Sequence, residues 1–240
     1  MNIGIITQAR MTSSRLPGKI LKEVKGKSLL TYHIERLKHS GFPVIVATTT
    51  NETDNPVIDF CINKGIPYSR GSEENVLSRF YNAAVENNLD IIVRVTSDCP
   101  LIDPHLIRNS MEKYLKFNNE NLYVSNVIDR TFARGFDFEI FSFRLLEDAY
   151  KNATESADLE HVTPYIRKNI KGDTEFYDIK QSKNHNDLRI TVDTAEDFQL
   201  IQELIVTFDA DLLPYNGIEE ILLQHPELIA INAHIEQKKV

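Results

Sequence analysis

The residues best suited to chemistry lie in short stretches, and the first stretch holds three cations. Arg10, Arg15 and Lys19 follow a run of β-forming residues that begins at Ile3 and stops at Thr7. Small residues stand between the cations, so backbone N–H groups can approach an anion that the three side chains neutralise. The stretch is typical of a phosphate-binding loop, and an ordinary solvated basic loop is the alternative.

Two carboxylates follow other strand-like segments. Asp98 comes directly after the apolar run 91–95 and is held by the proline that follows, which suits oxygen coordination of Mg²⁺ at a nucleotide phosphate. Capping of a loop is the alternative role for Asp98. Asp193 precedes Thr194 and Asp197, which suit the start of a helix. That capping explains Thr194 and Asp197 but leaves Asp193 without a structural role.

The elements that must position these residues alternate along the first half of the chain. The pattern predicts strands at 3–7, 44–48 and 91–95, and helices at 28–39, 56–64 and 72–87. Such a βαβ succession predicts a mostly parallel sheet with right-handed crossovers and ligands at the carboxyl ends of its strands. The loops that carry Arg10 and Asp98 should therefore lie at one edge of the sheet.

The regular alternation weakens after Asn118. We expect strands at 122–127, 136–143 and 188–193, and helices at 143–151 and 159–169. The segment at about 125–185 is interpreted as an extension of a single domain, 1–240, that serves substrate binding and dimerisation, so a homodimer is expected. Asp137 and Glu139 would form the polar face of a strand, either solvated or sugar-binding. His161 is a packed or capping residue unless it contacts substrate.

Composition limits the classes of partner. A net charge of −8 disfavours general nucleic-acid binding and favours small anions at the local basic loop. The sequence contains no apolar run long enough to predict a membrane span, and its two cysteines form no CxxC pair. We therefore expect a cytoplasmic protein without nucleic-acid or membrane partners.

The order of residue types from Ala9 to Lys19 closely resembles the N-terminal signature of the cytidylyltransferases that make CMP-sugars. Their 3-deoxy-manno-octulosonate and acylneuraminate enzymes share it, and the relatives of the spore coat polysaccharide biosynthesis protein F type are closer still. Segments 134–141 and 160–166 resemble that spore-coat branch specifically. The resemblance implies an α/β nucleotide-diphospho-sugar transferase fold, Rossmann-like and of the GT-A type, with three layers and a mixed, mainly parallel sheet.

The resemblance also implies a reaction and its residues. CMP would pass from CTP to a sugar, most simply a sugar acid, with release of pyrophosphate, for a surface or spore-coat polysaccharide. Mg²⁺ would be held by Asp98 and Asp193, and the catalytic residues would be Arg10, Lys19 and Asp98. The implied nucleotide-binding residues are Gln8, Ala9, Arg10, Arg15, Lys19, Gly71, Ser72 and Asn75. Substrate contacts would fall on Asp137, Glu139 and His161, and no general base is identifiable.

Two other functions remain open. A sugar-1-phosphate nucleotidylyltransferase that uses another NTP would share the fold, but its glycine-rich loop is missing at 11–14. A non-catalytic sugar-nucleotide-binding protein would not need both Asp98 and Asp193.

Overall fold

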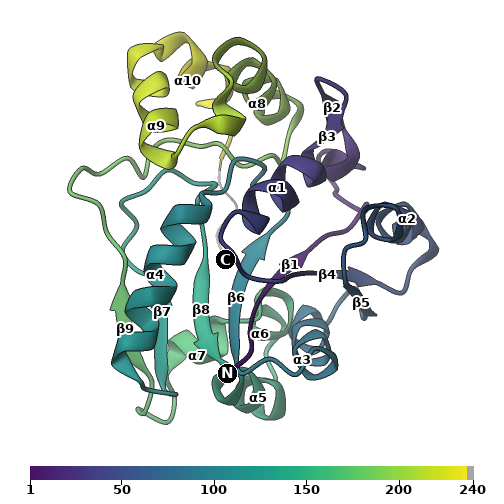
Figure 1. Cartoon of the computed structure of the whole chain (residues 1–240), viewed down its shortest axis with the longest axis vertical. Helices are drawn as coiled ribbons and strands as arrows, with labels where there is room; N and C mark the ends of the chain where they lie inside the picture. The colour runs from purple at the N-terminus through teal and green to yellow at the C-terminus, as the bar shows by residue number, and fades with distance from the viewer. Residues whose placement is uncertain (237–240) are drawn as a thin grey trace.

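The computed structural model describes residues 1–236 and is built on a seven-stranded sheet (Figure 1). The strand order is β5-β4-β1-β6-β8-β7-β9. The strands of this sheet are β1 (Ile3–Gln8), β4 (Val44–Thr49), β5 (Tyr68–Gly71), β6 (Ile91–Thr96), β7 (Leu122–Ser125), β8 (Glu139–Ser142) and β9 (Glu175–Asp178). The first four in spatial order are parallel, β8 is antiparallel to both neighbours, and β9 is parallel to β7. This is the mixed, mainly parallel sheet that the sequence predicts.

Helices cover both faces of the sheet and give the three layers. One face carries α1 (Leu29–Lys38), α2 (Asn55–Lys64) and α4 (Pro104–Phe117). The same core extends into α8 (Ala195–Phe208), α9 (Tyr215–Gln224) and α10 (Pro226–Asn232). The other face carries α3 (Val76–Glu86), α5 (Phe143–Asn152), α6 (Ser156–His161) and α7 (Pro164–Lys168). Successive strand residues point to opposite faces, so Ile5 joins one core and Ile6 the other. The α/β fold class is therefore confirmed.

Short elements complete the chain. A two-stranded ribbon, β2 (Glu23–Val24) with β3 (Lys27–Ser28), precedes α1, and single 3₁₀ turns are η1 (Lys19–Leu21), η2 (Glu52–Asp54) and η3 (Ala210–Leu212). Figure 1 shows the last three helices gathered together at one end of the molecule. Within residues 1–236, no helix combines the length and apolar character needed to cross a bilayer.

Local capping chemistry explains the boundaries that the sequence predicted well. The Ser28 side chain accepts a hydrogen bond from the backbone N–H of Thr31 at the start of α1. Gly65 ends α2 in the left-handed conformation, which glycine adopts without steric cost. The predicted helix at 72–87 starts later, at Val76, because Ser72 opens a turn and Asn75 is the residue whose side chain caps the helix.

Three predictions from the second half of the chain are wrong in extent. The strand predicted at 136–143 is confined to β8, and the helix predicted at 159–169 is split into α6 and α7. The split follows from a positive φ of 71° at Val162 and from Pro164, whose ring cannot continue a helix. The expected strand at 188–193 makes only one isolated bridge, between Arg134 and Arg189.

Candidate active site

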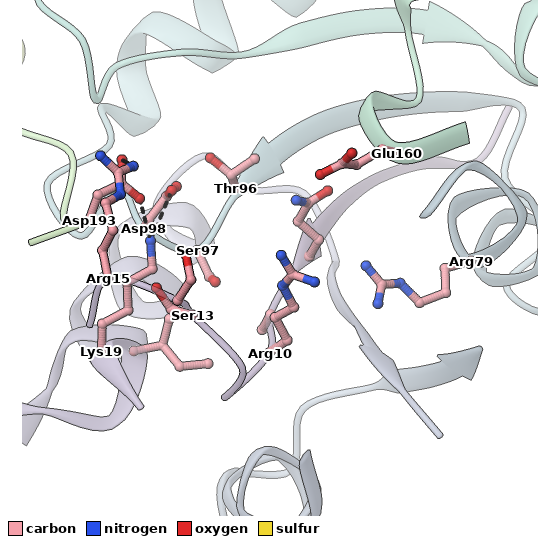
Figure 2. A pocket seen from close by; sticks show the side chains of 14 residues that line it. Arg10, Ser13, Arg15, Lys19, Arg79, Thr96, Ser97, Asp98, Glu160 and Asp193 are labelled. Carbon is pink, nitrogen blue, oxygen red and sulfur yellow. Dashed lines mark hydrogen bonds and ion pairs between the residues drawn. The ribbon is translucent and has the colours of Figure 1, made fainter. Parts of the chain in front are cut away.

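A cavity of about 230 Å³ opens where β1 and β6 end (Figure 2). The two strands are parallel and in register, with Gln8 opposite Thr96, so the loops that follow them start side by side. The lining residues are Gln8, Ala9, Arg10, Ser13, Ser14, Arg15, Lys19, Ile20, Arg79, Thr96, Ser97, Asp98, Glu160 and Asp193. The basic loop and the Asp98 loop therefore share one edge of the sheet, as the βαβ pattern predicts.

Lys19 links the two predicted metal ligands at one end of this cavity. Its Nζ lies 2.8 Å from Asp193 Oδ1 and 3.3 Å from Asp98 Oδ2, and only 11% of the Lys19 side chain is exposed. Burial alone would lower the pKa of Lys19, but the two carboxylates outweigh it and leave that pKa raised. Lys19 is thus a charged ammonium group that holds both carboxylates together.

Two arginines complete the charge around Asp193. Arg15 Nη2 and Arg189 Nη2 lie 2.9 Å and 2.8 Å from Asp193 Oδ2. Burial alone would raise the pKa of Asp193, but Lys19, Arg189 and Arg15 outweigh it and leave that pKa lowered. Asp193 is therefore a carboxylate held ionised by three cations.

The backbone around Asp193 is fixed by a buried network from the C-terminal helices. Asp197 Oδ2 accepts hydrogen bonds from the backbone N–H groups of Asp193 and Thr194, and Thr194 completes the predicted capping box. Arg189 forms an ion pair with the fully buried Asp197, and Asn232 Nδ2 of α10 donates to the same carboxylate at 2.8 Å. Capping by Thr194 and Asp197 is confirmed, and contacts from α8 and α10 fix the backbone that carries Asp193.

A buried histidine that the sequence did not single out fixes the Asp98 loop. His33 Nδ1 lies 2.8 Å from the Cys99 carbonyl, which can only accept, so Nδ1 carries the proton and Nε2 accepts from Thr7 Oγ1 at 2.9 Å. Burial lowers the pKa of His33 to about 4, so the ring is neutral at neutral pH. The Val192 N–H also donates to the Asp98 carbonyl at 2.8 Å, which joins the two carboxylate-bearing loops directly.

The basic loop is tied to the turn before α3 through Glu73. Arg10 Nη1 and Thr12 Oγ1 lie 3.3 Å and 2.6 Å from Glu73 Oε1. The neighbouring nucleotide-binding candidates at 71, 72 and 75 do not line the cavity: Asn75 caps α3, and Ser72 Oγ accepts from the Asn75 N–H at 3.0 Å. Their contact with a nucleotide stays a prediction.

The three predicted substrate residues also lie outside the cavity lining. Asp137 is paired with Arg130, and His161 is half-buried at the end of α6. Glu139 is buried, so the prediction that it could lie on a solvated face of a strand is wrong. Burial would raise its pKa, but Arg94 and the Thr163 and Tyr123 hydroxyls outweigh it and leave the pKa of Glu139 lowered.

Two charged residues absent from the predicted site also line the cavity: Arg79 of α3 and Glu160 of α6. Arg79 lies on the buried stripe of α3, between Val76 and Ala83 at helical spacing, and is 2% exposed. A cation at an apolar position of an amphipathic helix was the sequence signal that could have indicated it. Glu160 precedes the candidate His161 and faces the opposite wall of the cavity from Arg10 (Figure 2).

The donors available for a metal ion are few. Among residues 1–236, no group of three or more His, Cys, Asp or Glu side chains is arranged to hold one. Asp98 and Asp193 nevertheless converge on a single cation, Lys19 Nζ. Two carboxylates suit Mg²⁺, which keeps several waters and takes its other ligands from phosphate oxygens.

Comparison with known proteins gives the chain its family. The family model described as Cytidylyltransferase matches residues 3–240. The spore coat polysaccharide biosynthesis protein SpsF of Bacillus subtilis is 32% identical over 85% of this chain and 86% of its own. A 3-deoxy-manno-octulosonate cytidylyltransferase of Haemophilus influenzae is 32% identical over 49% of this chain and 47% of its own.

A solved cytidylyltransferase from Leptospira borgpetersenii superposes over all of this chain and 99% of its own, with a TM-score of 0.90 and 33% identity. The predicted fold and the resemblance at residues 9–19 agree with these findings. The chain therefore belongs to the cytidylyltransferase family.

Proposed function

We propose that this protein transfers CMP from CTP to a hydroxyl group of a sugar acid and releases pyrophosphate. The observation that carries the proposal is the convergence of Asp98 and Asp193 on Lys19, beside Arg15, at the carboxyl end of a parallel sheet. A phosphoryl-type transfer needs cations to stabilise the phosphates and carboxylates to hold a metal ion, because the protein contributes mainly positioning and charge stabilisation.

The residues have distinct roles in this reaction. The sugar hydroxyl oxygen attacks the α-phosphorus in line, the bond from the α-phosphorus to the bridging oxygen breaks, pyrophosphate leaves, and the hydroxyl proton passes to solvent. Arg10, Arg15 and Lys19 bind the triphosphate and neutralise charge on the leaving group. Asp193 keeps Arg15 and Lys19 oriented through ion pairs of 2.9 Å and 2.8 Å. The His33 hydrogen bond keeps the Asp98 loop in position.

Asp98 and Asp193 would also hold Mg²⁺. When bound there, the ion supplies positive charge against the phosphate oxygens of the nucleotide. Lys19 shares both carboxylates, so its ammonium group would turn toward the triphosphate, whose oxygens replace the carboxylates as acceptors.

The names of relatives support the choice of substrates. One relative is named for the cytidylyl transfer to 3-deoxy-manno-octulosonate, a sugar acid, and another for spore coat polysaccharide biosynthesis. On the same family likeness we also propose a role in a surface polysaccharide, a homodimer and a cytoplasmic location. Segment 125–185 is the proposed region for the acceptor sugar and for dimer contacts.

Pyrophosphate release tests the reaction. The purified protein is incubated with Mg²⁺, each of the four NTPs in turn and a panel of sugar acids and neutral sugars. Release that requires both CTP and one of the sugar acids supports the proposal. Release with another NTP and a sugar-1-phosphate favours the related nucleotidylyltransferase reaction, and tight CTP binding without any release favours a binding protein.

A further inference from the structure

Arg79 is a buried cation whose guanidinium group has unpaired nitrogens. It is 2% exposed, and neither Nε nor Nη1 has a hydrogen-bond partner in the structure of residues 1–236. Burial and the nearby Arg10 lower the pKa of Arg79 to about 10, so the group still carries its charge at neutral pH. Buried polar groups in native proteins are normally paired, and an unpaired one calls for an explanation.

The position of Arg79 supplies the explanation. Figure 2 shows its guanidinium turned toward Arg10 in the cavity, at the end away from Lys19 and the two aspartates. Glu160 lines the cavity at the same end, across from Arg10 (Figure 2). Glu73 pairs with Arg10 at 3.3 Å, but within residues 1–236 no carboxylate forms an ion pair with Arg79. An anion bound between the two guanidinium groups would offset the repulsion between them.

The neighbouring strand is shaped to allow this arrangement. A Cβ atom added at Gly71 would lie 2.6 Å from Cγ of Arg79, closer than side-chain packing permits. Gly71 therefore gives the stem of Arg79 room to run past the end of β5 into the cavity. The close approach of Arg79 thus explains why a glycine stands at position 71, without any contact between Gly71 and a nucleotide.

We propose that Arg79 and Arg10 form a binding subsite for one oxyanion, a phosphate or a carboxylate group, at the end of the cavity opposite Asp98 and Asp193. A guanidinium group donates two parallel hydrogen bonds to either anion. Glu160 repels a second anion, so the subsite accepts one group. The subsite proposal rests on the proposed function only for the two candidate sources of that group, the nucleotide and the sugar acid.

Calorimetric titration of two variants tests the subsite. Arg79→Gln removes the charge. Arg79→Lys keeps the charge but lacks the two parallel N–H donors of a guanidinium group, and Arg108→Gln is the matched control. Arg108 donates to the backbone carbonyl of Ser40 at 2.9 Å and does not line the cavity. The probes are pyrophosphate, CTP with Mg²⁺, N-acetylneuraminate and 3-deoxy-manno-octulosonate, each titrated alone.

We expect Arg79→Gln to weaken binding of at least one probe by roughly 10- to 100-fold, the scale of a charge-assisted hydrogen bond. Arg79→Lys should fall between Arg79→Gln and the unchanged protein, and Arg108→Gln should bind like the unchanged protein. A loss for CTP or pyrophosphate identifies a nucleotide phosphate as the occupant, and a loss for a sugar acid identifies its carboxylate. Glu160→Gln should tighten binding of the same probe.

A second readout separates this role from a structural one. Without ligand, Arg79→Gln should melt no lower than the unchanged protein, because the substitution removes an unpaired buried charge. Unchanged affinity of both Arg79 variants for every probe overturns the proposal, as does failure of the unchanged protein to bind any probe. If anion binding depends on Arg79 but CTP yields no pyrophosphate, the subsite stands and the proposed reaction fails.

Discussion

Replacement of Lys19 by methionine perturbs the site at its electrostatic centre. Methionine keeps the length of the stem but leaves Asp98 and Asp193 facing each other without the ammonium group that lies within 3.3 Å of both. Removal of one partner from a buried ion pair costs about 3 kcal/mol. For a chain of this size that loss lowers the melting temperature by roughly 6–12 °C.

Magnesium should restore much of that stability. Without the ammonium group, Asp98 loses its ion pair with Lys19, while Asp193 keeps its pairs with Arg15 and Arg189. The two carboxylates then form a better cation site than when Lys19 also neutralises them. A ligand at about 100 times its dissociation constant adds about 2.7 kcal/mol to the free energy of unfolding. Thermal melts of Lys19→Met with and without millimolar Mg²⁺ should therefore differ by several degrees, and melts of the unchanged protein should differ less.

Lys25→Met is the control, because Lys25 pairs with Asp209 at the surface, where both side chains are exposed. Loss of an exposed pair has little effect on stability, and this variant should show no added response to Mg²⁺. If Lys19→Met melts like Lys25→Met and responds to Mg²⁺ no more strongly, Asp98 and Asp193 do not form a common cation site.

Three further predictions concern the groups around this centre. Asp98→Asn and Asp193→Asn should each reduce turnover by roughly 10²-fold in the pyrophosphate assay with little change in secondary structure by circular dichroism, and near-normal turnover of both would remove their catalytic role. His33 has a folded pKa of about 4 against 6.5 in the unfolded chain, so its contribution is complete above pH 6.5. About 3 kcal/mol of stability should be lost as the pH falls toward 4, and urea unfolding of His33→Gln should lack that slope. Gly135→Ala should destabilise the protein by about 3 kcal/mol, since φ is +117° and the new Cβ would lie 2.6 Å from Ile190; an unchanged urea midpoint would contradict this.

The features that the sequence predicts correctly are those whose determining chemistry is local. The end of β1 before Arg10, the cap at Ser28 and the capping box at Thr194 each depend on residues within a few positions of one another. The shared edge of the Arg10 and Asp98 loops followed from the parallel βαβ rule, which needs no side-chain coordinates.

The rest depended on contacts between distant parts of the chain. Lys19 and Asp193 are 174 positions apart, so no spacing rule could bring them to 2.8 Å. Glu139 follows an alternating polar pattern, yet it is buried because α6 and α7 cover that part of the sheet and Thr163 reaches its carboxylate. Arg79 was missed because its role depends on which side of α3 faces the cavity.

The helix predicted at 159–169 illustrates a different limit. Its apolar spacing is helical throughout, but Pro164 divides it and Val162 adopts a positive φ. Within α6, before that break, Glu160 lines the cavity and His161 does not. Adjacent side chains of a helix point in different directions, so Glu160 lines the site and His161, which the sequence singled out, does not.

Product analysis by ³¹P NMR tests whether the protein transfers CMP from CTP to a sugar acid. The protein is incubated with CTP, Mg²⁺ and the sugar acid that gives the strongest pyrophosphate release, beside an Asp98→Asn control. We expect a CMP phosphodiester and pyrophosphate to appear in equal amounts as CTP disappears, and the control to form neither at a comparable rate. Formation of CDP and inorganic phosphate instead, or of pyrophosphate with free CMP and no sugar phosphodiester, would contradict this expectation.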